Sequence, residues 1–425
     1  MKIEKWTVGL AAAGLVSLSP TLVAQTPTPP PQVIPLQTAL SATTISGYVD
    51  TSAVWNPGTG NANPAPYAFN AGKQDGFNVD AVDVKISRAE DESPWAAGYV
   101  AELSYGPDAE AIDGGAYPIR QAYVEMRMPL GNGLDWQLGR WDNLLGYESS
   151  DAMKDPNWTR SYGYTAEPTE HTGLLATYKF CDAFTLQAGV ADTVTTSGIN
   201  DRSEGGTAIE SKKALVSLAT LTAPDSWGAF KGSTLAAGFD DGAGAPSHNR
   251  EELYVGTTIN TPIKDLTFGA SWDAIFHNDA FSENFATETF GDMDQGYFTA
   301  YAGYVSYKVT EKLTINGRAE YASGPTLGAW ADGFNGIAAG DFGETGFVRF
   351  PSRLDKVFAL TGTVQYDLWA NVISRLEIRW DHAANGADAF GGTGAPGESD
   401  ITGAPIGLAN KKNEVMVAAN VIYKF

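Results

Sequence analysis

The 425-residue chain has little of what many common functional sites require. It contains one cysteine, Cys181, which excludes an internal disulfide and any cysteine-based zinc or iron–sulfur centre. Its four histidines are scattered, and none is spaced to share a metal ion with another. Basic residues number 28 against 50 acidic ones, and the net charge of −22 argues against the basic face that nucleic acid needs. We expect no metal, no cofactor and no nucleic-acid partner.

Long hydrophobic runs are also scarce. Lys2 and Lys5 precede an apolar stretch over residues 6–18, and small residues end at Ala24, so we predict a signal peptide over residues 1–24. A membrane anchor is the alternative, but about 13 apolar residues are too few for a spanning helix of roughly 20. Residues 25–43 are rich in proline and predict an extended spacer. No later segment is apolar over 18 residues, which excludes a transmembrane helix.

What the chain does have is many glycines, many aromatic residues and segments in which apolar and polar residues alternate. The 47 glycines and 11% aromatic residues favour many short strands over helices. Alternation is clear near residue 376, where Leu376, Ile378 and Trp380 share one face of the predicted strand. The opposite face carries Arg375, Glu377, Arg379 and Asp381. A packed soluble core cannot accept such a charged second face, whereas a water-filled lumen can.

Sixteen segments show this alternation. They are residues 44–55, 78–90, 94–105, 117–128, 134–141, 171–181, 184–194, 212–222, 232–239, 250–260, 266–276, 294–308, 313–322, 354–367, 372–382 and 411–425. Long and short connections alternate between them, which is typical of outer-membrane barrels. A β-sandwich or propeller has no physical reason to alternate its connections by length, so the pattern argues against both. We therefore predict an all-β fold over residues 44–425, a transmembrane up-and-down antiparallel β-barrel. It should have about 16 strands (range about 14–18), long extracellular loops and short periplasmic turns.

The C-terminal segment is the sharpest local signal. Val421, Tyr423 and Phe425 lie on one face of the last predicted strand, and the chain ends on phenylalanine. This resembles the terminal strand that bacterial outer-membrane proteins present to their assembly machinery. We therefore expect these three residues to act as an assembly signal.

Three runs carry a resemblance to a known family. They are TTISGYVDTSAVW (Thr43 to Trp55), LGRWDNLLGYESSDAMKDPNWTRSYGYTAEPTEHTGLLATYKF (Leu138 to Phe180) and VAANVIYKF (Val417 to Phe425). With them the chain resembles bacterial outer-membrane porins and, more narrowly, the OmpL-like family of β-barrel porins. The resemblance implies passive transport of small hydrophilic solutes in the outer membrane of a Gram-negative-type bacterium. It also implies contact with outer-membrane lipid and the barrel-assembly machinery, and general porins suggest a homotrimer by analogy.

The third long connection, residues 142–170, resembles in position the loop that narrows general porins. We hypothesise that its carboxylates and a set of inward arginines face one another across the water path as a pore constriction. The acidic members are Glu148, Asp151 and Asp155, and the basic members are Arg127, Arg318, Arg375 and Arg379. Opposed charges would set a transverse field that favours small polar solutes. The alternative is an exposed acidic loop with unrelated lumen arginines. The overall acidic surplus predicts a weak preference for cations.

Three classes of function remain open at this stage. The first is a diffusion channel, with a substrate-specific channel, for example for sugars, as its variant. The second is an enzyme in the barrel wall, which needs a lipid-facing Ser–His pair that the predicted outward faces do not offer. The third is a structural or adhesive barrel without an open pore. We expect a non-enzymatic channel.

Overall fold

The structure is a computed structural model, and it describes most of the chain beyond residue 41. The described residues are 42–58, 65, 75–109, 118–194, 200, 203–204, 207–208, 213–244, 248–278, 295–324, 356–392 and 409–425. The predicted signal peptide, and the predicted spacer as far as residue 41, lie outside the described residues. No helix among the described residues is long and apolar enough to cross a membrane.

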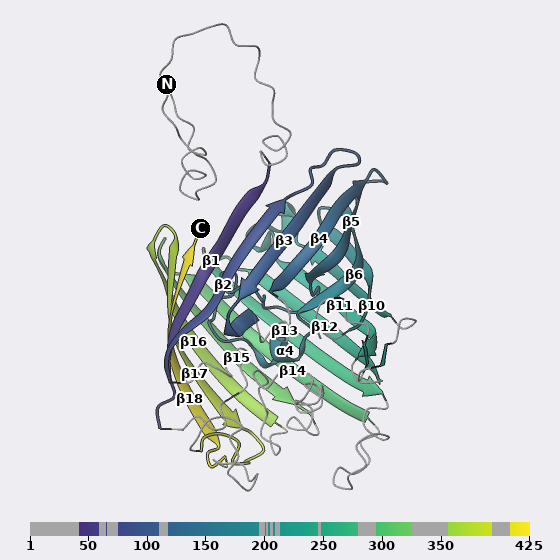
Figure 1. Cartoon of the computed structure of the whole chain (residues 1–425). Helices are drawn as coiled ribbons and strands as arrows, with labels where there is room; N and C mark the ends of the chain where they lie inside the picture. Colours follow the sequence, from purple (N-terminus) through teal and green to yellow (C-terminus); the bar gives the residue numbers. More distant parts are fainter. Residues whose placement is uncertain are drawn as a thin grey trace, which may run out of the picture. The chain divides into compact units, whose positions relative to one another are not determined.

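Within the described residues, sixteen antiparallel strands form a closed barrel (Figure 1). They are β1 (Thr44–Trp55), β2 (Gly76–Arg88), β3 (Ala97–Tyr105), β4 (Ile119–Met128), β5 (Leu134–Asp142), β6 (Glu170–Cys181), β7 (Phe184–Ala191), β10 (Ala214–Thr222), β11 (Thr234–Gly244), β12 (His248–Asn260), β13 (Leu266–Asn278), β14 (Gln295–Lys308), β15 (Leu313–Ser323), β16 (Lys356–Trp369), β17 (Val372–Ala383) and β18 (Asn413–Lys424). Each strand pairs with its neighbours along the chain, and each corresponds to one predicted segment. The predicted fold class is confirmed.

The ring closes where β1 pairs with β18, in a register that sets Tyr48 opposite Lys424 and Trp55 opposite Val417. The last rung joins Gly47 and Phe425, whose backbone groups exchange two hydrogen bonds of 3.1 and 3.0 Å. Closure matters because a sheet in lipid cannot leave an edge of unpaired N–H and C=O groups. Val421, Tyr423 and Phe425 are all exposed on the outer surface of this seam.

The two faces of the sheet differ in chemistry, as the alternation predicts. On β17, Leu376 and Ile378 are 57% and 56% exposed, whereas Glu377 and Arg379 are 0% exposed. An apolar exposed face is the surface that lipid covers in a transmembrane barrel, so the charged face points into the lumen. The same arrangement holds on β15, where Ile315 is exposed and Arg318 is buried.

Connections are long at one end of the barrel and short at the other. Residues 129–133 join β4 to β5, and residues 182–183 join β6 to β7; we term this side the short-turn end. The other end has long connections, including residues 143–169 between β5 and β6. Outside the barrel strands the described residues form α4 (Tyr162–Ala166), the 3₁₀ helix η1 (Asp225–Phe230) and the small pair β8 (Ser203–Glu204) and β9 (Thr207–Ala208).

Several strand ends differ from the predicted ones. β3 begins at Ala97 rather than at residue 94, because Trp95 has a φ of 63° that an extended strand cannot contain. β11 runs on to Gly244, five residues beyond the predicted end at residue 239, because it stays paired with β12 as far as His248. These shifts concern the rims, where the alternating pattern gives the least information.

Candidate functional site

Residues 143–169, which we term the internal loop, lie inside the barrel. Their partners are the inward, buried side chains of the strands, while the outward side chains of the same strands stay exposed. The helix α4 contacts β13, β14 and β15 from within (Figure 1). A barrel of sixteen strands is wide enough to hold a loop and water, whereas a barrel of eight would be filled by its own side chains.

The internal loop is first ordered by contacts within itself. Ser161 caps α4, since its Oγ accepts a hydrogen bond of 3.1 Å from the Tyr164 N–H. Arg160 contacts the Asp155 carboxylate at 2.9 Å and donates to the Ser149 carbonyl at 3.0 Å. The other Asp155 oxygen accepts from the Ser149 N–H at 2.9 Å. These bonds pull residues 149–160 into one compact turn.

Successive inward residues of β17 then bind successive residues of this turn. Arg375 comes first and donates to the carbonyls of Ala152 and Asp155, at 3.0 and 2.7 Å. Glu377 follows and accepts from the N–H groups of Trp158 and Thr159, at 2.6 and 2.9 Å. The loop backbone thus runs alongside β17 in the same direction.

The pattern continues at the next two inward positions of β17. Arg379 donates to the Arg160 carbonyl at 2.7 Å, and the Tyr162 hydroxyl donates to Asp381 at 2.8 Å. The Tyr162 N–H also donates to Glu320 of β15 at 2.7 Å. Four alternating charges, spaced by the period of the strand, therefore satisfy successive polar groups of the internal loop.

Arg318 of β15 binds both the internal loop and a neighbouring wall residue. Its guanidinium contacts the carboxylates of Glu148 at 2.8 Å and Glu320 at 2.6 Å. It also donates to the Thr159 carbonyl at 2.7 Å. All three side chains in this ion-pair group are almost fully shielded from water, so each charge depends on the others.

The structure brings together some of the predicted constriction residues and separates others. Glu148 touches Arg318, and Arg375 binds the backbone carbonyl of Asp155, whereas Arg379 pairs with Asp381 at 2.9 Å. Glu148 and Arg318 thus meet in direct contact, whereas the sequence predicted that the two sets of charges would face one another across a water path. The reason is that the internal loop packs on the arginine-bearing wall itself.

Two predicted residues lie elsewhere. Asp151 pairs with Lys154 within the internal loop at 3.4 Å. Arg127 lies beside the short turn after β4, where it pairs with Asp135 at 2.7 Å and donates to the Asn132 carbonyl at 2.9 Å. Its guanidinium is therefore engaged at the short-turn end and does not join the group around Arg318.

Sequence reasoning missed a second charged group, on β3 to β6. Arg120 contacts Glu102 at 2.5 Å and Asp142 at 3.1 Å, and Arg140 contacts Glu170 at 3.3 Å. Gln121 also donates to Glu102 at 2.8 Å, so two adjacent residues of β4 reach the same partner. Strict alternation forbids this, but a register shift at Glu102 permits it. Glu320, Glu377 and Asp381 were not included in the predicted constriction, although the sequence places Glu377 and Asp381 on the same charged face as Arg375 and Arg379.

Burial changes the acidity of two carboxyl groups of the internal loop. Burial raises the pKa of Asp155 to about 6, with the nearby Arg160 acting in the opposite direction. Burial, together with the carboxylates of Asp273 and Glu252, raises the pKa of Glu167 well above its usual range. The docked loop therefore favours the protonated form of both groups.

We predict that the internal loop docks more firmly in acid. A carboxyl group whose pKa is raised in the docked state stabilises docking below its ordinary pKa, and this contribution is lost as the pH rises through the raised value. For Asp155 the loss of docking stability falls between about pH 4 and pH 6. Glu167, whose pKa is raised further, extends this range to higher pH. Single-channel recordings should show a higher conductance or more current noise at pH 8 than at pH 5, and Glu167→Gln should weaken the difference. A conductance that falls with rising pH would contradict this prediction.

Together, the closed sixteen-strand ring, the charged inward face and the internal loop define a class, the porin-type outer-membrane barrel. The family model described as putative beta-barrel porin-2, OmpL-like, matches residues 42–424. The chain belongs to this family, and it is an outer-membrane protein of a Gram-negative bacterium.

Solved structures show the same fold at low sequence identity. An anion-selective porin from Comamonas acidovorans is 11% identical, with a TM-score of 0.54 over 90% of this chain and 99% of that one. Salmonella typhi OmpF in complex with daunomycin is 13% identical, with a TM-score of 0.52 over 90% and 97%. OmpT of Vibrio cholerae in a trimer form is 11% identical, with a TM-score of 0.50 over 90% and 99%. A search of curated proteins finds no match.

Proposed function

We propose that this protein is a non-enzymatic porin that forms a water-filled channel for passive diffusion of small hydrophilic solutes and ions. The observation that carries the proposal is the charged inward face of a sixteen-strand barrel, whose internal loop is held against one sector of the wall. Barrels of this size leave an aqueous path, because the wall side chains alone do not fill them.

Swelling of liposomes that contain the purified, folded protein tests this function directly. Small sugars such as arabinose should enter and swell the liposomes at rates that fall with solute size. If one sugar class enters far faster than others of equal size, the channel is substrate-specific. If no solute enters although the barrel is folded, the diffusion channel is refuted.

The charge of the lumen supports a weak preference for cations. Among the described residues, buried acidic side chains, such as Glu252 and Asp240 on the inward face, outnumber buried basic ones. A surplus of fixed negative charge concentrates cations in a narrow path. The anion-selective porin shares only the fold with this chain, so its selectivity does not transfer.

We predict that the reversal potential in a potassium chloride gradient will have the sign of a cation-preferring channel. The preference should shrink in Glu252→Gln, because that change removes one fixed negative charge from the lumen wall. It should persist in Asp182→Asn, which removes a negative charge from a fully exposed turn instead. A reversal potential of the opposite sign in the unmodified protein would refute the cation preference.

A structural or adhesive barrel is the second candidate. It is favoured by the tight fit of the internal loop, since Glu377 and Arg379 are 0% exposed beneath it. A loop packed this closely could block the lumen instead of narrowing it. Liposomes that stay impermeable while the folded protein binds an outer-membrane or periplasmic partner would support this reading.

Several further expectations complete the proposal. The signal peptide over residues 1–24 would direct export, and the residues from Val421 to Phe425 would be recognised by the barrel-assembly machinery. Lipid would cover the apolar outer face, and the short-turn end would face the periplasm. The trimer form of OmpT supports, by fold, a homotrimer here as well, which cross-linking in membranes would test.

A further inference from the structure

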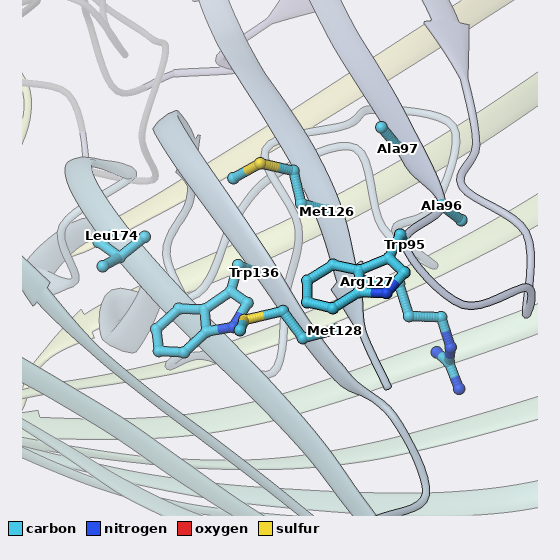
Figure 2. Close-up of a pocket in the computed structure, with 8 residues that line it drawn as sticks. All are labelled: Trp95, Ala96, Ala97, Met126, Arg127, Met128, Trp136 and Leu174. Atoms are coloured by element: carbon cyan, nitrogen blue, oxygen red, sulfur yellow. The ribbon is translucent and has the colours of Figure 1, made fainter. Parts of the chain in front are cut away.

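An apolar groove lies on the outer face of the barrel at the short-turn end. It has a volume of about 490 Å³ and is formed by β3, β4, β5, β6 and the turn before β3. Its lining includes Trp95, Met126, Met128, Trp136 and Leu174 (Figure 2). Trp95, Met126 and Leu174 are exposed, which places the groove on the side that lipid covers. The volume is within the range of about 300–1,000 Å³ that is usual for small-ligand sites.

The position of the groove along the barrel axis determines its depth in the bilayer. Met128 is the last residue of β4, and Trp136 is the third residue of β5, on either side of the short turn over residues 129–133. Tryptophan is enriched at this level because its ring is apolar and its N–H is polar. The groove therefore opens where lipid ester groups and the first part of the acyl chains lie.

Trp95 lies over the groove with a strained backbone conformation. Its φ of 63° lies in the left-handed region that a bulky side chain rarely adopts. Backbone hydrogen bonds on its C-terminal side hold this shape, since the Ala96 N–H donates to Ser93 at 3.2 Å and the Ala96 carbonyl accepts from Arg127 at 2.9 Å. Backbone strain of this kind persists where the surrounding structure enforces it, and it gathers at binding sites.

Trp136 provides a hydrogen-bond donor without an acceptor. Its Nε1 atom is buried and has no hydrogen-bond partner among the described residues. A buried N–H without an acceptor is unfavourable, so an oxygen atom brought to it would be bound with a net gain. Met128 lines the same groove, and its flexible thioether side chain can move aside for such an atom. Figure 2 shows the Arg127 guanidinium pointing away from Trp136.

A positive charge lies on the outer face at the same end of the barrel as the groove. Arg88, at the end of β2, pairs across the sheet with Tyr99 of β3, and both belong to the outward set of residues. Arg88 is exposed, at the same end of the barrel as Trp95 and on the strand next to β3. An outward arginine at the membrane boundary is suited to a lipid phosphate.

We propose that this groove is a binding site for one glycerophospholipid of the periplasmic leaflet. An acyl chain lies against Met126 and Leu174, under the Trp95 ring. An ester carbonyl accepts the Trp136 Nε1 hydrogen bond, and the phosphate lies near Arg88. The site is separate from the lumen, so the lipid would stay bound whether or not the channel conducts.

Native mass spectrometry of the full-length, detergent-purified protein tests the site. Palmitoyl-oleoyl phosphatidylethanolamine is added, and the bound fraction is measured as detergent is exchanged. The unmodified protein should retain one lipid. Trp136→Phe keeps an aromatic ring but removes the donor, and it should lower retention several-fold. Trp95→Gly should lower retention without loss of thermal stability, because glycine adopts the left-handed region freely.

Trp272→Phe serves as the matched control. Trp272 lies on the outer face of β13, away from the groove, and its Nε1 already donates to Thr299 at 3.0 Å. This variant should retain lipid like the unmodified protein, and all the variants should keep the unmodified conductance. Equal retention in every variant, or one adduct of lipopolysaccharide in place of phospholipid, would overturn the proposal. A change in conductance without a change in lipid retention would also overturn it.

Discussion

Replacing Arg318 by alanine is expected to release the internal loop from the barrel wall and to raise the single-channel conductance. The Arg318 guanidinium contacts the carboxylates of Glu148 and Glu320 and donates to the Thr159 carbonyl. Removing it takes the cation away from the buried Glu148 carboxylate and leaves Glu320 with Arg379 at 3.7 Å, and breaking a buried ion pair in this way costs about 3–5 kcal/mol. Because about 1.4 kcal/mol corresponds to a factor of ten, the ratio of released to docked loop should rise by roughly 10² to 4 × 10³.

Arg127→Ala is the matched control for this experiment. Arg127 also pairs with a carboxylate, that of Asp135, but at the short-turn end and without contact to the internal loop. Its loss should leave the conductance close to that of the unmodified protein. If Arg318→Ala and Arg127→Ala both conduct like the unmodified protein, the loop is not held in place by the charges of β15 and β17.

Deleting Phe425 is expected to reduce the protein in the outer membrane to a small fraction of its usual amount. Phe425 exchanges two backbone hydrogen bonds with Gly47 at the seam of the barrel. Each such bond contributes about 0.5–1.5 kcal/mol, so their direct loss is roughly 1–3 kcal/mol, which a full ring of paired strands tolerates. A large loss in cells would therefore reflect failed recognition by the assembly machinery.

Two measurements separate recognition from stability. The deletion variant should refold in detergent with a yield near that of the unmodified protein, judged by its shifted mobility on unheated gels. In cells its outer-membrane level should fall sharply, and Phe425→Tyr, which keeps an aromatic terminus, should restore much of it. A deletion variant that reaches the outer membrane at its usual level would refute the assembly role of the terminal residue.

Local patterns were enough to predict the barrel. Alternation on β17 separates Leu376 and Ile378 from Glu377 and Arg379, and the structure places the two pairs on opposite faces of the sheet. This works because the side-chain period of a strand is two and because lipid and water demand different chemistry of the two faces. The alternation of loop lengths then favoured an up-and-down barrel over a sandwich.

The path of the internal loop could not be predicted in the same way. It depends on contacts between residues far apart in the chain, such as Glu148 with Arg318 and Trp158 with Glu377. The sequence singled out charges of both signs but could not show whether they would meet or stay apart. Arg120 was missed for a different reason, since a register shift beside β4 brings it to Glu102 on the inward face.

Single-channel conductance of the purified, folded protein in a planar bilayer, under a salt gradient, tests the central claim most directly. We expect stable open steps whose reversal potential shows a weak preference for cations and whose size rises in Arg318→Ala. Steps that shrink when a sugar is added would identify a substrate-specific channel within the same account. A folded barrel that gives no conductance, either unmodified or as Arg318→Ala, would contradict the account.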